Sequence, residues 1–226
     1  MTMDGTEVPS GGPHELADGG LGEEAVRWFR GYLVREHPLL GRGGAVCPFV
    51  EPALRAGTVL LEVHRVGSDV SRSGLTELVR KLVESFRGKE WPHRNRTLHA
   101  LVGLLPGLSP TQLAWLDEVQ AEVKPSLAEE GLMLGQFHER CREPAARNPD
   151  FPVSRSPVPM LAVRHMALHD VLFLHSGRRG FLAYRDRFGH LYRRSLPVDP
   201  LFAELYDSAL DRFRVSDGIS AVTPGQ

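Results

Sequence analysis

Residues 97–107 restrict the possible folds more than any other part of this 226-residue chain, and they read TLHALVGLLPG. Apolar side chains occupy both sets of alternating positions in this stretch. A strand with one face in water alternates apolar and polar residues, whereas a strand buried on both faces is apolar throughout. The stretch therefore predicts a central strand, and such a strand needs a packed layer on each side of its sheet.

Amphipathic helices are predicted on both sides of this strand in the sequence. Residues 74–88 carry an apolar residue at every third or fourth position, which is the stripe of a helix packed on a core. The next helix begins at Ser109, with Pro110 at its first position and Gln112 completing a capping box. The other predicted helices span residues 23–37 and 199–213.

Three more strands are predicted, at residues 58–66, 132–138 and 159–166. Residues 139–159 are rich in proline and are predicted to form a long irregular loop, a kind of segment that is usually functional or disordered. Residues 167–192 fit either helices or a hairpin. The order of the elements predicts an α/β fold, with α+β as the alternative, built on one sheet of about four strands with packed helices.

A single globular domain is expected at residues 21–215, because this length suits one sizeable core. The flanking segments, residues 1–20 and 216–226, have too little apolar surface to offset the entropy of ordering them. We therefore expect both segments to be disordered tails.

Charge and composition argue against several classes of protein. A formal net charge of −1 does not favour binding to nucleic acid or to an anionic membrane. The first residues lack the apolar core of a signal peptide, and no apolar run is long enough to span a bilayer. The two cysteines do not make a disulfide framework. A cytoplasmic protein with free thiols is the expectation.

Cys47 is the first candidate for chemistry, and it follows a glycine-rich loop in the segment GRGGAVCPFV. A free cysteine often serves as a small buried apolar residue, and that interpretation stays open. Alternatively, a short helix after Cys47 would favour its thiolate, which can attack carbon or bind iron. Gly43 and Gly44 would then let the backbone approach a bound cofactor closely.

His138 is the second candidate, because it ends an apolar strand where the long loop begins. Such strand ends are where α/β folds place ligands, although a hydrogen-bonded structural histidine is the competing interpretation. His138 and Cys141 have an H-x2-C spacing, but no further close pair of ligands follows. A structural zinc site is therefore not expected from the sequence.

Two segments together resemble the YqcI/YcgG-type proteins. The segment VCPFVEPALRAGTVLLEV, residues 46–63, resembles the opening motif of that group. The segment VSRSPVPMLAVRHM, residues 153–166, resembles its later Ser-Arg motif. The chain also looks like a family of actinobacterial proteins of unknown function with the signature HPLLGRGGAVCPF. The YqcI/YcgG-type group includes heme-dependent N-hydroxylases of arginine or related guanidines.

The YqcI/YcgG-type resemblance implies a heme-dependent monooxygenase that N-hydroxylates a guanidine or an amine in specialised metabolism. Cys47 or His138 would be the axial ligand, Gly43 and Gly44 would lie against the heme, and Ser154 and Arg155 would belong to the site. Arg155 would bind a carboxylate, of either heme or substrate.

Several alternatives and partner predictions remain beside the heme hypothesis. The chain could be an enzyme with Cys47 as nucleophile, or a non-catalytic accessory protein of a biosynthetic pathway. The expected partners are a small molecule with a carboxylate or a guanidine and a redox protein, with a homodimer left open. No partnership with nucleic acid or membrane is expected.

Overall fold

The computed structural model describes residues 19–67, 69–193 and 197–214. Most of both predicted tails, residues 1–18 and 216–226, therefore lies outside the described residues. Residues 19 and 20, which the sequence predicts to be part of the first tail, begin helix α1.

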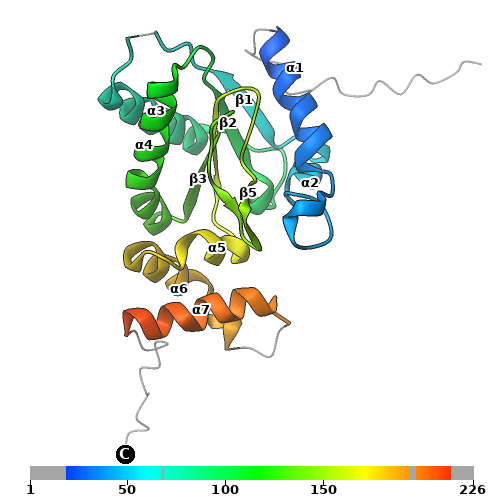
Figure 1. Ribbon diagram of the computed structural model, residues 1–226, viewed down its shortest axis with the longest axis vertical. Coiled ribbons are helices and arrows are strands. Elements are labelled where there is room, and N and C mark those ends of the chain that lie inside the picture. Colours follow the sequence, from blue (N-terminus) through cyan, green and yellow to red (C-terminus); the bar gives the residue numbers. More distant parts are fainter. Residues whose placement is uncertain (1–18, 68, 194–196, 215–226) are drawn as a thin grey trace, which may run out of the picture.

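One four-stranded sheet forms the centre of the fold (Figure 1). Its strands, in spatial order, are β1 (Val59–Val63), β2 (Ala100–Leu104), β6 (Met160–His165) and β3 (Leu132–Phe137). Strands β1 and β2 are parallel, whereas β6 runs antiparallel to both of its neighbours. The predicted α/β fold with about four strands and packed helices is confirmed.

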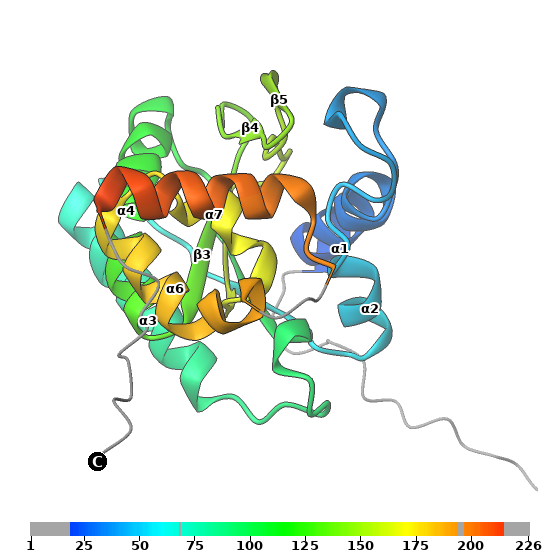
Figure 2. The ribbon, with the colours of Figure 1, turned by 90° about the horizontal axis from the view of Figure 1, so that it is seen from below.

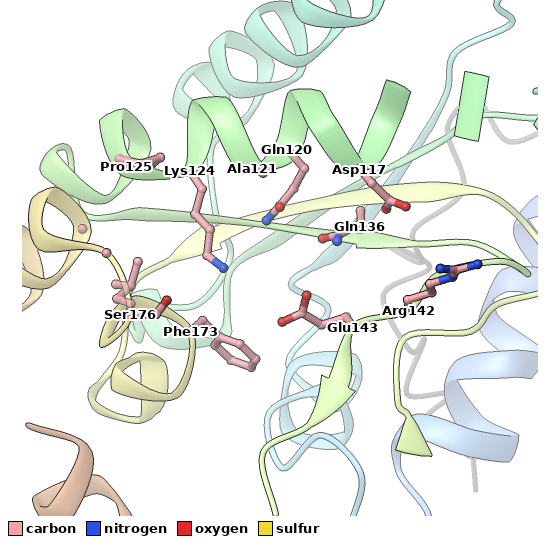
Figure 3. A pocket seen from close by; sticks show the side chains of 13 residues that line it. Asp117, Gln120, Ala121, Lys124, Pro125, Gln136, Arg142, Glu143, Phe173 and Ser176 are labelled. Atoms are coloured by element: carbon pink, nitrogen blue, oxygen red, sulfur yellow. The ribbon is translucent and has the colours of Figure 1, made fainter. Parts of the chain in front are cut away.

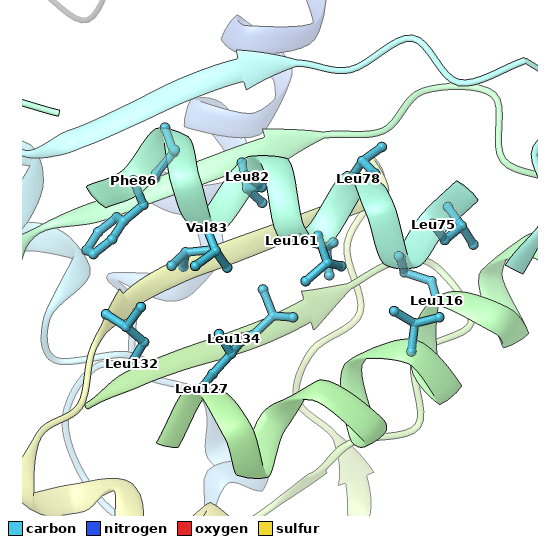
Figure 4. Close-up of a cluster of buried hydrophobic side chains, with 14 of the residues drawn as sticks. Leu75, Leu78, Leu82, Val83, Phe86, Leu116, Leu127, Leu132, Leu134 and Leu161 are labelled. Atoms are coloured by element: carbon cyan, nitrogen blue, oxygen red, sulfur yellow. The ribbon is translucent and has the colours of Figure 1, made fainter. Parts of the chain in front are cut away.

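Helices cover both faces of the sheet (Figures 1 and 4). Helices α3 (Arg72–Gly88) and α4 (Pro110–Glu129) bury their apolar stripes against one face. Helix α1 (Gly19–Trp28), its π-helical continuation η1 (Phe29–Leu33) and helix α2 (Val50–Arg55) pack against the other face. Strand β2 contributes Leu101 to the first cluster and Val102 to the second. Strand β2 is therefore buried on both faces of the sheet, as its sequence predicts.

The capping box predicted at the start of α4 is present. The Ser109 hydroxyl accepts a hydrogen bond from the Gln112 backbone N–H at 3.3 Å, and the Ser109 N–H donates to the Gln112 side chain at 2.8 Å. Helix α3 begins at Arg72 with Ser71 as its cap, two residues before the predicted start. These boundaries follow from local side-chain chemistry, which is why the sequence predicts them closely.

Three helices pack at one end of the sheet (Figure 2). They are α5 (Val171–Leu174), α6 (Arg178–Tyr192) and α7 (Pro200–Phe213), and the 3-10 turn η4 (Leu168–Asp170) precedes them. The ambiguous segment 167–192 is thus helical. The Tyr184 hydroxyl donates to the Leu168 carbonyl at 2.5 Å and ties α6 to the turn. None of the described helices is both long and apolar enough to cross a membrane.

The prediction of an irregular loop at residues 139–159 is wrong in part, because the segment contains a small hairpin. Its strands are β4 (Pro144–Ala145) and β5 (Asn148–Pro152), and 3-10 helix η2 (Pro38–Leu40) lies beside them. The Phe151 ring stacks on His37 at 4.4 Å, and the Tyr32 hydroxyl donates to the Val153 carbonyl at 2.9 Å. Contacts with the N-terminal part of the chain therefore order this segment.

Candidate functional site

A cavity of about 430 Å³ lies on the face of the sheet formed by β3 and β6. Gly135 of β3 and Ala162 of β6 are directly paired and line this cavity, and the small size of these two residues leaves the space open. The loop before Cys47, the β4–β5 hairpin, α5 and the start of α7 form the other walls. Apolar side chains dominate the lining: Leu33, Leu40, Val46, Met133, Phe137, Ala145, Val153, Leu172, Phe173, Leu201 and Phe202.

Cys47 is half-buried and lines this cavity. Its backbone N–H donates to the carbonyl of Leu33, the last residue of the π-helical segment, at 2.8 Å. The π turn itself is marked by the bond from the Val34 N–H to the Phe29 carbonyl at 3.1 Å. Short π-helical segments are often found at functional sites. The thiol is thus carried by a backbone that is hydrogen-bonded to the helix layer.

Arg164 projects from β6 into the same cavity and pairs with the buried Asp170. Its two terminal nitrogens donate to the two carboxylate oxygens at 2.8 and 2.5 Å, and the Ala167 N–H donates to Asp170 at 2.7 Å. Burial alone would raise the pKa of Asp170, but Arg164 holds it below its ordinary value. Burial alone would lower the pKa of Arg164. The charge and hydrogen bonds of Asp170 outweigh burial and raise this pKa, and Cys47 adds a further small rise. The thiol therefore lies within electrostatic reach of a fixed guanidinium.

His169 lies next to this ion pair and also lines the cavity. Its Nε2 atom is 3.4 Å from both Asp170 Oδ1 and a terminal nitrogen of Arg164, and its ring stacks on Phe49 at 4.5 Å. Burial, with further contributions from Arg164 and Arg42, lowers the pKa of His169 to about 4, although Asp170 opposes the shift. The imidazole is therefore uncharged at neutral pH.

A second cavity, of about 500 Å³, adjoins the first along the free edge of β3 (Figure 3). Lys124 of α4 and Glu143 extend into this space from opposite sides and line both cavities. Burial lowers the pKa of Lys124, while the charge of Glu143 opposes that shift. The Lys124 ammonium lies 5.7 Å from the centre of the Phe173 ring. A partly desolvated cation therefore stands between the two cavities.

The structure brings together only some of the residues that the sequence suggested. Cys47 and Ser154 both line the first cavity, and Ser154 is buried. Arg155, Gly43 and Gly44 are exposed and are not among the residues lining it. The glycine that approaches other backbone closely is Gly41, where an added Cβ would lie 3.0 Å from the Arg147 carbonyl oxygen. His138 lies outside this cavity, bonded to Asp117 at 2.9 Å and grouped with Cys141.

Three residues of the site with shifted pKa values have no predicted role from the sequence: Arg164, His169 and Asp170. One signal was available, because Arg164 is a charged residue in the apolar strand MLAVRH. A charge in such a strand needs a partner, since a buried unpaired charge is very unfavourable. The partner, Asp170, lies only six residues further along the chain.

Comparison with known proteins identifies the family. Residues 22–199 match the family described as a domain of unknown function, DUF6875, and the chain belongs to it. No curated protein and no solved structure matches the chain.

Proposed function

We propose that this member of the DUF6875 family is an enzyme that acts on a small molecule in the first cavity, with the Cys47 thiolate as its nucleophile. The observation that carries the proposal is the position of Cys47 on the wall of a cavity that Arg164 and His169 also line. The thiolate, rather than the thiol, is the reactive form of cysteine. Partial exposure of Cys47 gives a substrate access to it.

The neighbouring residues have separate roles in this proposal. Asp170 holds the Arg164 guanidinium in place through two hydrogen bonds, so the positive charge beside the thiol stays oriented. His169 is uncharged at neutral pH and can accept a proton or a hydrogen bond. Phe49, two residues after Cys47, stacks on the His169 ring and joins the two parts of the site.

The charges of the lining indicate the substrate class. The cations lining the first cavity are Arg42, Lys124, Arg147 and Arg164, and the acids are Glu143 and Asp199. Arg147 pairs with Asp199 at 2.6 Å, whereas Arg42 is bonded to backbone carbonyls. The excess of positive charge favours a substrate with an apolar body and a carboxylate, held by Arg42 and Lys124.

Iodoacetamide at neutral pH is expected to modify Cys47 and to leave Cys141 unmodified in the native protein. Cys47 is half-buried on the cavity wall, whereas Cys141 is fully buried and burial raises its pKa to about 11. Mass spectrometry of the peptides measures the modification of each site. The Cys141→Ser variant should keep the reaction and Cys47→Ala should lose it. A Cys47 that reacts only in denaturant would count against the proposal.

Heme-dependent monooxygenation of a guanidine or amine is the second candidate function. One observation favours it: the Cys47 thiol faces a largely apolar cavity that also carries arginine and lysine side chains. These residues fit heme in kind: Cys47 would hold the iron, and Arg42, Lys124 and Arg147 would bind the carboxylates of the heme. A thiolate-bound heme supplies oxygen activation, because the thiolate favours cleavage of the O–O bond. Electrons would come from a redox partner.

Titration with hemin distinguishes the heme-dependent function from the function in which Cys47 is a nucleophile. If the heme hypothesis holds, the protein is expected to develop a Soret band with one equivalent of hemin. Cys47→Ala should shift or lose the band, and His138→Ala should keep it, because His138 lies outside this cavity. Protein that stays colourless after addition of hemin, yet is alkylated at Cys47, would support the nucleophile alone.

A further inference from the structure

A group of three side chains with metal-binding atoms lies apart from Cys47. Asp117 comes from α4, His138 follows β3, and Cys141 stands three residues further on. One oxygen, one ring nitrogen and one sulfur of these residues lie within 4.8 Å of one another. A bond from the Cys141 N–H to the His138 carbonyl at 3.0 Å forms the turn that brings the two side chains together.

Burial distinguishes this group from an ordinary surface cluster. His138 is 1% exposed and Cys141 is 0% exposed. One ring nitrogen of His138 bonds to Asp117, but its buried Nδ1 atom has no partner among the described residues. A buried polar atom without a partner is unfavourable, and such atoms often mark an absent ion or water. Asp117 is the accessible member, with 39% of its side chain exposed.

We propose that Asp117, His138 and Cys141 bind a zinc ion whose fourth position opens toward the second cavity. Asp117 lines that cavity, together with Gln136 and Arg142 (Figure 3). Three protein ligands with one open position are typical of reactive zinc sites, in which water or a substrate oxygen completes the tetrahedron. The site is independent of Cys47 and of the function proposed for it.

The chemistry of the donor atoms selects the metal. A thiolate and an imidazole disfavour Mg²⁺ and Ca²⁺, which prefer oxygen ligands, whereas zinc accepts sulfur, nitrogen and carboxylate oxygen. Ligand atoms around a tetrahedral zinc are about 3.5 Å apart, as follows from metal–ligand distances of about 2.0–2.3 Å. The ligand atoms lie within 4.8 Å of one another, and the Asp117 oxygen is 2.9 Å from a His138 ring nitrogen. Zinc binding therefore requires side-chain adjustments of about 1 Å, and the half-exposed Asp117 is free to move.

The sequence alone did not indicate this site, because its H-x2-C spacing lacked a third ligand nearby. Asp117 lies 21 residues before His138, and only the packing of α4 along the edge strand β3 brings the two together. The Gln120 side chain fixes this packing, since it donates to the Leu134 carbonyl at 2.7 Å.

The test is metal binding by the full chain after treatment with a chelator. We expect one equivalent of Zn²⁺ to bind, and Co²⁺ in its place to give a thiolate-to-metal absorption band. Asp117→Asn should weaken zinc binding at least about 100-fold, since even residues that only support a ligand contribute about 10–100-fold. Cys141→Ser should abolish the cobalt thiolate band. Excess Mg²⁺ should not compete.

Cys47→Ser is the matched control, because it removes the other thiol of the chain and should leave zinc and cobalt binding unchanged. Circular dichroism of each variant verifies folding, and Asp117→Asn, at a partly exposed position, provides the readout if Cys141→Ser does not fold. The proposal is overturned if the wild type binds no stoichiometric zinc. It is equally overturned if Asp117→Asn binds zinc as tightly as the wild type. The same holds if the Cys47→Ser variant loses the cobalt thiolate band.

Discussion

Replacing Asp170 by asparagine is expected to lower the free energy of unfolding by about 3–5 kcal/mol. Asp170 is fully buried and accepts hydrogen bonds from both terminal nitrogens of Arg164 and from the Ala167 N–H. Asparagine keeps the size of the side chain but not its charge, so the Arg164 guanidinium would remain largely buried without a counter-ion. Equilibrium unfolding in guanidinium chloride at neutral pH measures the change.

A double variant provides the control for this prediction. Arg164→Met combined with Asp170→Leu removes both charges, and replacing a whole buried pair by apolar residues is often nearly neutral. We expect the double variant to regain most of the stability lost by Asp170→Asn. If Asp170→Asn costs less than about 1 kcal/mol, the pair is as weak as an exposed ion pair, and Arg164 is not the fixed charge that the Cys47 site requires.

Acidification is expected to destabilise the protein in a window set by His169. Its pKa is about 4 in the folded chain and about 6.5 in an unfolded one, so the unfolded state binds the proton first as the pH falls. The contribution of uncharged His169 to the free energy of unfolding is therefore complete above about pH 6.5 and is lost progressively down to about pH 4. Between about pH 7.5 and pH 4.5, the free energy of unfolding should fall by about 2–3 kcal/mol through His169 alone.

His169→Gln isolates this contribution, because glutamine cannot titrate. The loss of stability between about pH 7.5 and pH 4.5, measured by denaturant unfolding, should be smaller in the variant by about 2–3 kcal/mol. His165, whose pKa burial also lowers to about 4, keeps part of the acid sensitivity in both proteins. Equal losses in the two proteins would show that His169 ionises as freely in the folded state as in the unfolded chain.

Elements with strong local signals were predicted well. The stripe of α3 and the Ser109 capping box depend on residues within four positions of one another, so the sequence shows them directly. The β4–β5 hairpin was missed because its order comes from distant contacts. His37 stacks on Phe151, and the Asn148 side chain donates to the Leu39 carbonyl at 2.8 Å. No local pattern within residues 139–159 reports such partners.

The candidate site was predicted in part for a similar reason. The unusual context of Cys47 drew attention to a residue that does line a cavity, and Ser154 joins it there. Arg164 and His169 lie more than 100 positions away from Cys47. Arg164 stands within the segment 153–166 that resembles the Ser-Arg motif, but that resemblance gives it no role, and His169 lies outside the segment. Both residues line the same cavity as Cys47 only because of how distant segments pack, and the periodicity of the sequence does not indicate that packing.

The sequence by itself determined the four strands of the central sheet, the helices α3 and α4 that cover one face, and the burial of β2 on both faces. Helix and strand periods and helix caps are properties of neighbouring residues, so a local stretch of sequence contains them. Only the tertiary structure decided the strand order and the register that pairs Gly135 with Ala162 and opens the cavity. It likewise decided which charges meet at Cys47 and how Asp117 joins His138. Such contacts between distant residues are fixed by the packing of the whole chain, and no local stretch of sequence contains them.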